Sequence, residues 1–400
     1  MSVINKVSEA RCCGCSACFA ICPKHCISMK ESKEGFLHPV AEAENCNNCG
    51  LCEKVCPVLA KHSPQSPPET VFAAKLRDEV RRKQSSSGGV FSLLAESILE
   101  EGGVVCAARF ASPLHLAHDF CTDKADLPAF LGSKYVQSDM SDCFRVIKKY
   151  LSEGRKLLFA GTGCQIMGLK AFLGKKYEGL ITMEVICHGV PSPALWRKYL
   201  REICERQGIA AEELSSVEFR NKDYSWHRYC MKIKANNETI YRKNLYDDPY
   251  LKAFLANLTL RNSCHNCPAK GFVSQSDITV GDYWGVDKHH PQTDDDKGVS
   301  CLLIRNTSLL YFFDERKIEL TPSKYEYISA SNPAMEHSAL PHPKKAQYLH
   351  DLQSTAFIKC TKAYTKTPLL QTLKRKLRPF LSKLKHLILT PIKATKQNNN

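Results

Sequence analysis

The sequence has no apolar stretch as long as a membrane-spanning helix, and residues 1–13 contain no apolar segment like that of a secretory signal peptide. We therefore expect a cytoplasmic protein, in which thiols stay reduced. Disulfides are not expected, although the chain has 21 cysteines. Those cysteines are then candidates for metal ligands or for buried packing residues.

Acidic residues are absent after Asp351, whereas the same stretch holds eleven lysines and arginines. Of the formal net charge of +15, only +4 therefore belongs to residues 1–351. This balance gives no reason to expect a nucleic-acid partner.

The basic tail has a pattern of its own. Apolar residues recur at helical spacing among its cations: Leu370, Leu373, Leu377, Phe380 or Leu381, Leu384 and Ile388. The pattern predicts a basic amphipathic helix, bent at Pro379, that docks on an anionic membrane surface or an acidic partner. The alternative is a helix that packs on its own body.

Two cysteine runs near the start of the chain share the spacing C-x2-C-x2-C-x3-C-P. They are Cys12, Cys15, Cys18 and Cys22, and then Cys46, Cys49, Cys52 and Cys56. Bacterial ferredoxins with two [4Fe-4S] clusters have this spacing, and the fourth cysteine of each run binds the other cluster. We predict Cys12, Cys15, Cys18 and Cys56 at the first cluster, and Cys22, Cys46, Cys49 and Cys52 at the second.

Other features of this region fit a compact ferredoxin module. Zinc is the alternative metal, but zinc sites use two separated cysteine pairs rather than crowded triplets. Cys13 and Cys26 lie off the ligand spacing and are expected to pack near the clusters. Residues 27–30 and 35–39 predict a hairpin. We place the ferredoxin domain at 1–60 and a proline-rich linker at 61–70.

Strand and helix patterns then alternate and predict a larger α/β domain over 71–350, followed by the tail at 351–400. Overall we expect an α/β (α+β) protein. Apolar strands over 156–160 and 180–186 lead directly to Cys164 and Cys187. Because open α/β sheets bind ligands at the carboxyl ends of their strands, these two cysteines should face one crevice.

A serine- and glycine-rich segment opens one of the predicted helices. It consists of Ser85, Ser86, Ser87, Gly88 and Gly89. Free hydroxyl and N–H groups at a helix start can bind a phosphate, although a plain serine cap explains the same residues.

Several motifs of the larger domain together resemble those of a known family. They are Gly161-Thr162-Gly163-Cys164-Gln165, Cys187-His188-Gly189-Val190-Pro191-Ser192, Cys264-His265-Asn266-Cys267 and the run from Ser276 to Gly285. With the segments 85–91 and 132–138, this set resembles the beta subunit of coenzyme F-420 hydrogenase/dehydrogenase. The resemblance covers residues 70–310, and a ferredoxin module commonly accompanies it.

The resemblance implies an iron-sulfur flavoprotein that uses FAD. By analogy, Cys164, Cys187, Cys264 and Cys267 would bind a third [4Fe-4S] cluster, and the 85–89 segment would bind the FAD diphosphate. The alternative is that Cys264 and Cys267 form half of a zinc knuckle while the other two are small packing residues.

Three further residues have two readings each. Lys134 would place a charge near the flavin or its phosphates, or would be a surface cation. His188 and Asp282 would deliver protons as catalytic residues. Alternatively, His188 would be a hydrogen-bond donor to the neighbouring cluster from outside its ligand set, and Asp282 would cap a turn.

The resulting hypothesis is an oxidoreductase that passes electrons from ferredoxin-type clusters through FAD to a small organic substrate or a deazaflavin-like coenzyme. An electron donor or acceptor protein would be its partner. The alternative is an electron-transfer subunit without its own substrate. Analogy alone also suggests a link to exopolysaccharide biosynthesis. The sequence shows no separate signature for the deazaflavin.

Overall fold

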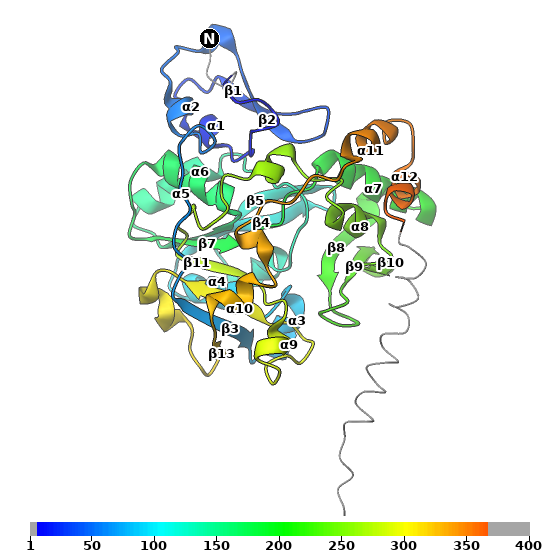
Figure 1. Ribbon diagram of the computed structural model, residues 1–400. Helices are drawn as coiled ribbons and strands as arrows, with labels where there is room; N and C mark the ends of the chain where they lie inside the picture. Colours follow the sequence, from blue (N-terminus) through cyan, green and yellow to red (C-terminus); the bar gives the residue numbers. More distant parts are fainter. Residues whose placement is uncertain (1–5, 367–400) are drawn as a thin grey trace, which may run out of the picture.

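A computed structural model of the chain describes residues 6–366 (Figure 1). At its amino-terminal end, a small module contains α1 (Ala17–Ile21), α2 (Leu51–Lys54) and an antiparallel pair, β1 (Ile27–Glu31) and β2 (Leu37–Ala41). The predicted hairpin is thus confirmed. Each short helix begins after a left-handed residue, Ser16 or Gly50, that lies just inside a cysteine run.

The centre of the molecule is an eight-stranded sheet in the order β13-β3-β12-β11-β7-β6-β4-β5. The strands are β3 (Thr70–Leu76), β4 (Val104–Ser112), β5 (His115–Cys121), β6 (Leu157–Gly161), β7 (Leu180–Val185), β11 (Ile278–Asp282), β12 (Ser300–Ile304) and β13 (Ile318–Pro322). Four central neighbours, β4, β6, β7 and β11, run parallel, and the outer strands pair antiparallel. The protein is therefore a mixed α/β protein whose parallel strands end at one edge.

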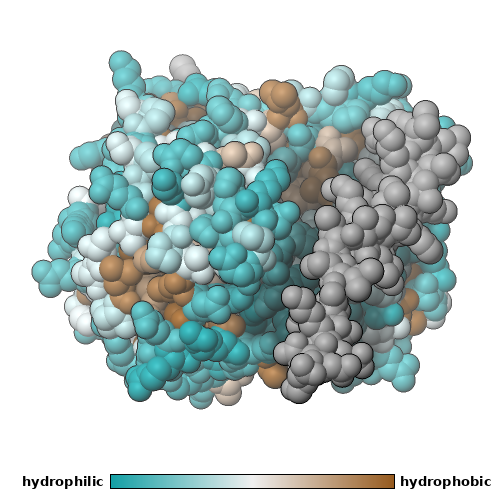
Figure 2. Space-filling view, turned by 60° about the horizontal axis from the view of Figure 1, so that its bottom comes forward, coloured by the Kyte–Doolittle hydropathy of each residue, from teal (hydrophilic) through white to brown (hydrophobic). Residues whose placement is uncertain are grey.

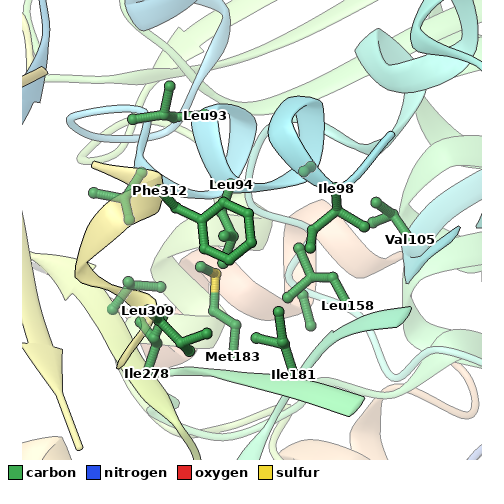
Figure 3. Packing of buried hydrophobic residues seen from close by; sticks show 14 of the residues in the cluster. Leu93, Leu94, Ile98, Val105, Leu158, Ile181, Met183, Ile278, Leu309 and Phe312 are labelled. Carbon is green, nitrogen blue, oxygen red and sulfur yellow. The ribbon is translucent and has the colours of Figure 1, made fainter. Parts of the chain in front are cut away.

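Helices cover the sheet: α3 (Glu79–Gln84), α4 (Val90–Glu100), α5 (Cys143–Ser152), α6 (Gly163–Leu173), α9 (Val286–His289) and α10 (Tyr325–Ser329). Alternate residues of each strand face opposite sides, so Val105 and Leu158 pack under α4, whereas Val104 and Leu157 pack under α5 and α6. Figure 3 shows Leu94 and other α4 side chains over this face of the sheet. The sheet is buried on both faces, as its apolar strands predict.

A separate lobe carries a three-stranded antiparallel sheet covered by helices (Figure 1). It consists of β8 (Leu214–Asn221), β9 (Cys230–Ala235), β10 (Glu238–Asn244), α7 (Pro193–Gln207), α8 (Pro249–Leu255), α11 (Lys345–Asp351) and α12 (Phe357–Tyr364). Phe357 is fully buried in the core of this lobe. The described part of the segment expected as a tail, up to residue 366, therefore packs on the body, and the predicted amphipathic helix lies outside the described residues.

The ferredoxin module rests on α6 and α5 (Figure 1). Gly168 of α6 permits this approach, because an added Cβ would lie 2.9 Å from the Cys15 sulfur. Arg145 of α5 donates to the carbonyl oxygens of Phe19 and Ala20 at 2.8 and 2.9 Å. The expected linker is extended along the body, where the N–H of Gln65 donates to Gly271.

The surface turned to the reader in Figure 2 is mainly hydrophilic, and apolar residues form only small separate patches on it. Within residues 6–366, no helix is both long enough and apolar enough to cross a membrane.

Candidate functional site

A cavity of about 1250 Å³ lies at the edge of the sheet where the parallel strands end. We call it the large cavity. Residues from four strands and the turns after them line it, among them Ala107 within β4, Gly161 and Asp282 at the ends of β6 and β11, and Cys187 just after β7. Its volume exceeds the 300–1,000 Å³ of most single-ligand pockets, so the large cavity has room for a dinucleotide and part of a second molecule.

The serine-glycine segment borders the large cavity just before α4, but most of its polar groups have partners in the protein. The Ser87 hydroxyl donates to Val299 at 2.8 Å and the Ser85 hydroxyl donates to Arg81 at 3.0 Å. Ser86 differs, because its oxygen accepts from the Ser133 N–H, which leaves the Ser86 hydroxyl proton for another acceptor. Among these residues, Ser86 is the best placed to donate to a bound anion.

The two glycines of the segment are explained by packing on the sheet. A Cβ on Gly88 would lie 2.0 Å from the Ala74 carbonyl oxygen, and a Cβ on Gly89 would lie 2.5 Å from Leu76. Gly89 also has a φ of +91°, where a side chain is strained. Gly89 lines the large cavity, whereas Gly88 faces strands β3 and β12.

Two lysines, the half-buried Lys134 and the buried Lys222, hold the loops of the large cavity. The Lys134 ammonium donates to the carbonyl oxygens of residues 130, 131 and 132 at 2.9 to 3.0 Å, and burial lowers its pKa to about 7. The Lys222 ammonium donates to the backbone carbonyl oxygens of residues 82, 87 and 297, and burial likewise lowers its pKa to about 7. Lys134 thus spends its three protons on the backbone, an arrangement that favours a positioning role.

The four cysteines of the predicted third cluster line one small cavity beside the large one. We call it the third cysteine cavity. It is bordered by Cys164 in the first turn of α6, by Cys187 just after β7, and by Cys264 and Cys267 from the C-x2-C turn. Cys164, Cys187 and the large cavity are brought together at the shared strand edge, as the sequence predicts.

The chemistry of these thiols fits a cluster. Burial, together with neighbouring thiols, raises the pKa of Cys264 to about 12 and that of Cys267 to about 11. Buried thiols ionise only when a cation compensates the thiolates, and a bound iron-sulfur cluster does so. Within residues 6–366, no three His, Cys, Asp or Glu side chains gather closely enough to bind a single metal ion, and the thiols line the cavity wall instead.

The module cysteines fall into the two sets expected from their spacing. Cys12, Cys15, Cys18 and Cys56 line one cavity of the module, the first module cavity. Cys22, Cys46, Cys49 and Cys52 line another, the second module cavity. Cys52 also borders the first of them. The crossover predicted for Cys22 and Cys56 thus agrees with the side-chain positions.

The two cysteines outside the ligand spacing lie next to these sets. Cys26 lines the second module cavity, and its sulfur is 3.4 Å from that of Cys22. Cys13 lines the first module cavity, the third cysteine cavity and the large cavity. The three sites are therefore contiguous, with the Cys13 side chain where they meet.

His188 stands between the third cysteine cavity and the large cavity. Its Nε2 lies 2.6 Å from Asn257 Oδ1, and the Asn257 amide donates to Leu340. Asn257 Oδ1 is therefore the acceptor, so Nε2 carries the proton, and Nδ1 has no hydrogen-bond partner among residues 6–366. Burial lowers the pKa of His188, which favours the neutral ring.

Asp282 ends β11 at the wall of the large cavity and is bound by two donors. Its Oδ1 accepts from Arg220 Nη2 at 2.8 Å and from Trp226 Nε1 at 2.7 Å. The Arg220 guanidinium also lies over the rings of Tyr229 and Trp284. An ion-paired carboxylate accepts hydrogen bonds, so this geometry favours a positioning role over proton delivery.

Comparison with known proteins agrees with this layout. Residues 71–145 match the amino-terminal part, and residues 154–324 the carboxyl-terminal part, of the family described as the beta subunit of coenzyme F420 hydrogenase/dehydrogenase. The chain belongs to this family. Residues 11–60 match a 4Fe-4S dicluster domain. The protein is thus an iron-sulfur member of an oxidoreductase family, with two [4Fe-4S] clusters in its amino-terminal domain.

Individual relatives are distant. The chain is 23% identical over 334 residues to an uncharacterized protein of Methanocaldococcus jannaschii, covering 74% of this chain and 84% of the relative. It is 23% identical over 288 residues to one of the subunits that form the F(420)H(2) dehydrogenase of Methanosarcina mazei, covering 68% and 75%. A chain of the F420-reducing [NiFe] hydrogenase complex from Methanosarcina barkeri aligns at 16% identity and a TM-score of 0.45, covering 76% and 94%.

Proposed function

We propose that this protein passes electrons between a redox partner protein and an organic substrate that binds in the large cavity beside a flavin. Cys164, Cys187, Cys264 and Cys267 would hold a third [4Fe-4S] cluster, and the large cavity would hold FAD. Bound there, the flavin would exchange electrons singly with clusters and in pairs with the substrate. The observation that carries the proposal is the contiguity of the three sites at Cys13.

The order of the sites supports a direction of access. Cys49 of the second module cavity is exposed, whereas Cys15 of the first is buried. The third cysteine cavity follows inward and borders the large cavity. A redox partner would therefore reach the second cluster at the surface around Cys49.

Residues of the large cavity would orient the flavin and its substrate. Ser86 and the start of α4 would face the FAD diphosphate, because a hydroxyl proton and the helix dipole both favour an anion. His188 Nδ1 can accept a proton there, while Asn257 keeps the proton on Nε2.

The test follows reduction of the bound flavin by a reduced one-electron donor protein in stopped flow. The double variant Cys264→Ser/Cys267→Ser should hold about four irons fewer and slow flavin reduction at least a hundredfold, with flavin content unchanged. Cys360→Ser, a buried thiol of α12, is the matched control. Unchanged iron content and unchanged flavin reduction in the double variant would refute the third cluster.

A second experiment concerns the flavin site. Ser86→Ala should weaken FAD binding by about tenfold, because it removes a hydrogen bond to an anion worth about 1.5 kcal/mol. Ser85→Ala removes a hydroxyl already bound to Arg81 and should leave FAD affinity unchanged. Isothermal titration of the deflavinated protein measures both, and equal affinities of the two variants would contradict the role of Ser86.

A second candidate function is an electron-transfer subunit without a substrate of its own. It is favoured by the name of the Methanosarcina mazei relative, which is one component of a larger dehydrogenase. The deazaflavin coenzyme in that name is then a candidate acceptor for the present chain. The test compares turnover of reduced F420 by the purified chain alone with turnover after partner proteins are added. Turnover by the chain alone favours an enzyme, and turnover only with partner proteins favours an electron-transfer subunit.

A further inference from the structure

One arginine joins the loops of two cysteine sites. The Arg261 side chain is 1% exposed, and its Nε donates to the Cys12 carbonyl oxygen at 2.6 Å. Its own carbonyl oxygen accepts from the Cys264 N–H at 3.0 Å. Arg261 therefore contacts the loop of the first cluster with its side chain and starts the turn that carries half of the third set.

Among the residues that the structure describes, the guanidinium has only uncharged hydrogen-bond partners. Nη1 donates to Gln137 Oε1 at 3.1 Å, and Nη2 lies 3.0 Å from His38 Nδ1. Burial and the charge of Arg261 lower the pKa of His38 to about 4, so the His38 ring accepts as a neutral base. Among residues 6–366, no carboxylate forms an ion pair with Arg261, whereas the buried Arg82 and Arg220 each have one.

A buried guanidinium without an anion is costly, so a negative charge is expected nearby. Clusters at the first and third cysteine sets would supply this charge, because a [4Fe-4S] cluster bound by four thiolates is negative. Arg261 is connected to both sets. The guanidinium contacts the Cys12 carbonyl oxygen, and its charge also acts on the Cys164 and Cys264 thiols.

We propose that Arg261 is a counter-ion shared by the first and third clusters and raises the reduction potential of both. The proposal rests on the proposed function for the third cluster only. One-electron reduction makes a cluster more negative by one charge, and a nearby buried cation stabilises that state. The second cluster, which is farther out in the module, lacks this cation, so electrons would be drawn inward from it.

The competing role is a mechanical one, in which Arg261 only clamps the module to the body. Arg145 provides the matched control. It also donates to module carbonyl oxygens, but its charge is neutralised by Asp142. Loss of Arg145 would therefore weaken docking without removing an uncompensated charge.

The experiment is a potentiometric titration with dithionite followed by EPR, on the full-length protein as purified without oxygen. The EPR signals of the second cluster are identified as those that change in the variant Cys49→Ser, which lacks one of its ligands. Arg261→Gln should lower the midpoint potentials of the first and third clusters and leave that of the second unchanged. Arg145→Gln should shift none of the three midpoint potentials. Arg261→Lys keeps the charge, so the potentials of the first and third clusters should stay close to those of the wild type.

A further variant covers the case in which Arg261→Gln does not fold. Gln137→Glu places a carboxylate against the guanidinium and should lower the same two potentials. Equal shifts in all three clusters, or unchanged potentials in both Arg261→Gln and Gln137→Glu with full iron content, would overturn the proposal. If the wild type holds only about eight irons, the third cluster fails separately, and the first cluster alone decides on Arg261.

Discussion

The ion pair between Arg220 and Asp282 should stabilise the wall of the large cavity. The two side chains are 3% and 15% exposed, and the Arg220 Nη2 to Asp282 Oδ1 distance is 2.8 Å. Removing one partner of a buried pair costs about 3–5 kcal/mol, because the other charge stays buried. Asp282 retains the Trp226 hydrogen bond and some water contact, so we expect Arg220→Met to cost about 3 kcal/mol.

A double-mutant cycle isolates this interaction. Arg220→Met/Asp282→Leu removes both charges and should recover about 2 kcal/mol of the loss. Urea unfolding followed by tryptophan fluorescence is a suitable assay, because Trp226 is part of the site. Arg228→Met, at an exposed position of the same cavity, should change stability by less than about 0.5 kcal/mol. The reasoning would be refuted if the stability loss of the double variant equalled the sum of the losses in Arg220→Met and Asp282→Leu measured singly.

Two more predictions concern stability and docking. Burial lowers the pKa of His118 to about 4, so between pH 6.5 and 4 the unfolded state binds a proton that the folded state does not, and stability should fall by about 3 kcal/mol. His118→Gln should flatten the pH dependence of the unfolding free energy measured with urea. The exposed control His350→Gln should keep it, and equal pH dependence in the two variants would contradict the prediction. Gly168→Ala should loosen the module, because its methyl group would meet Cys15. Faster proteolysis within residues 61–68 measures this, and an unchanged rate would argue against close packing there.

Local spacing accounts for what could be predicted from the sequence. The module cysteines lie close together along the chain, so their spacing alone predicts the two clusters and the crossover. The convergence of Cys164 and Cys187 follows from topology, because parallel strands end at one edge. The strands β5 and β13 were not predicted, since they pair antiparallel at the sides of the sheet and carry many polar residues.

Contacts between distant residues account for what the sequence did not show. Arg220 and Asp282 are 62 positions apart, and Arg261 and Cys12 are 249 apart, so no local pattern marks either arginine. Only the position of Arg261 just before the C-x2-C pair could have drawn attention to it. The use of Lys134 on backbone carbonyls also depends on how a loop folds, which residue type alone does not reveal.

The account depends most on three clusters and one flavin in a single chain. The most direct test is the content of iron, zinc and flavin per chain after purification without oxygen, together with the absorption spectrum. About twelve irons and one FAD are predicted, as three four-iron clusters and one flavin require. About eight irons and no flavin would contradict the account and leave only the amino-terminal dicluster domain in place.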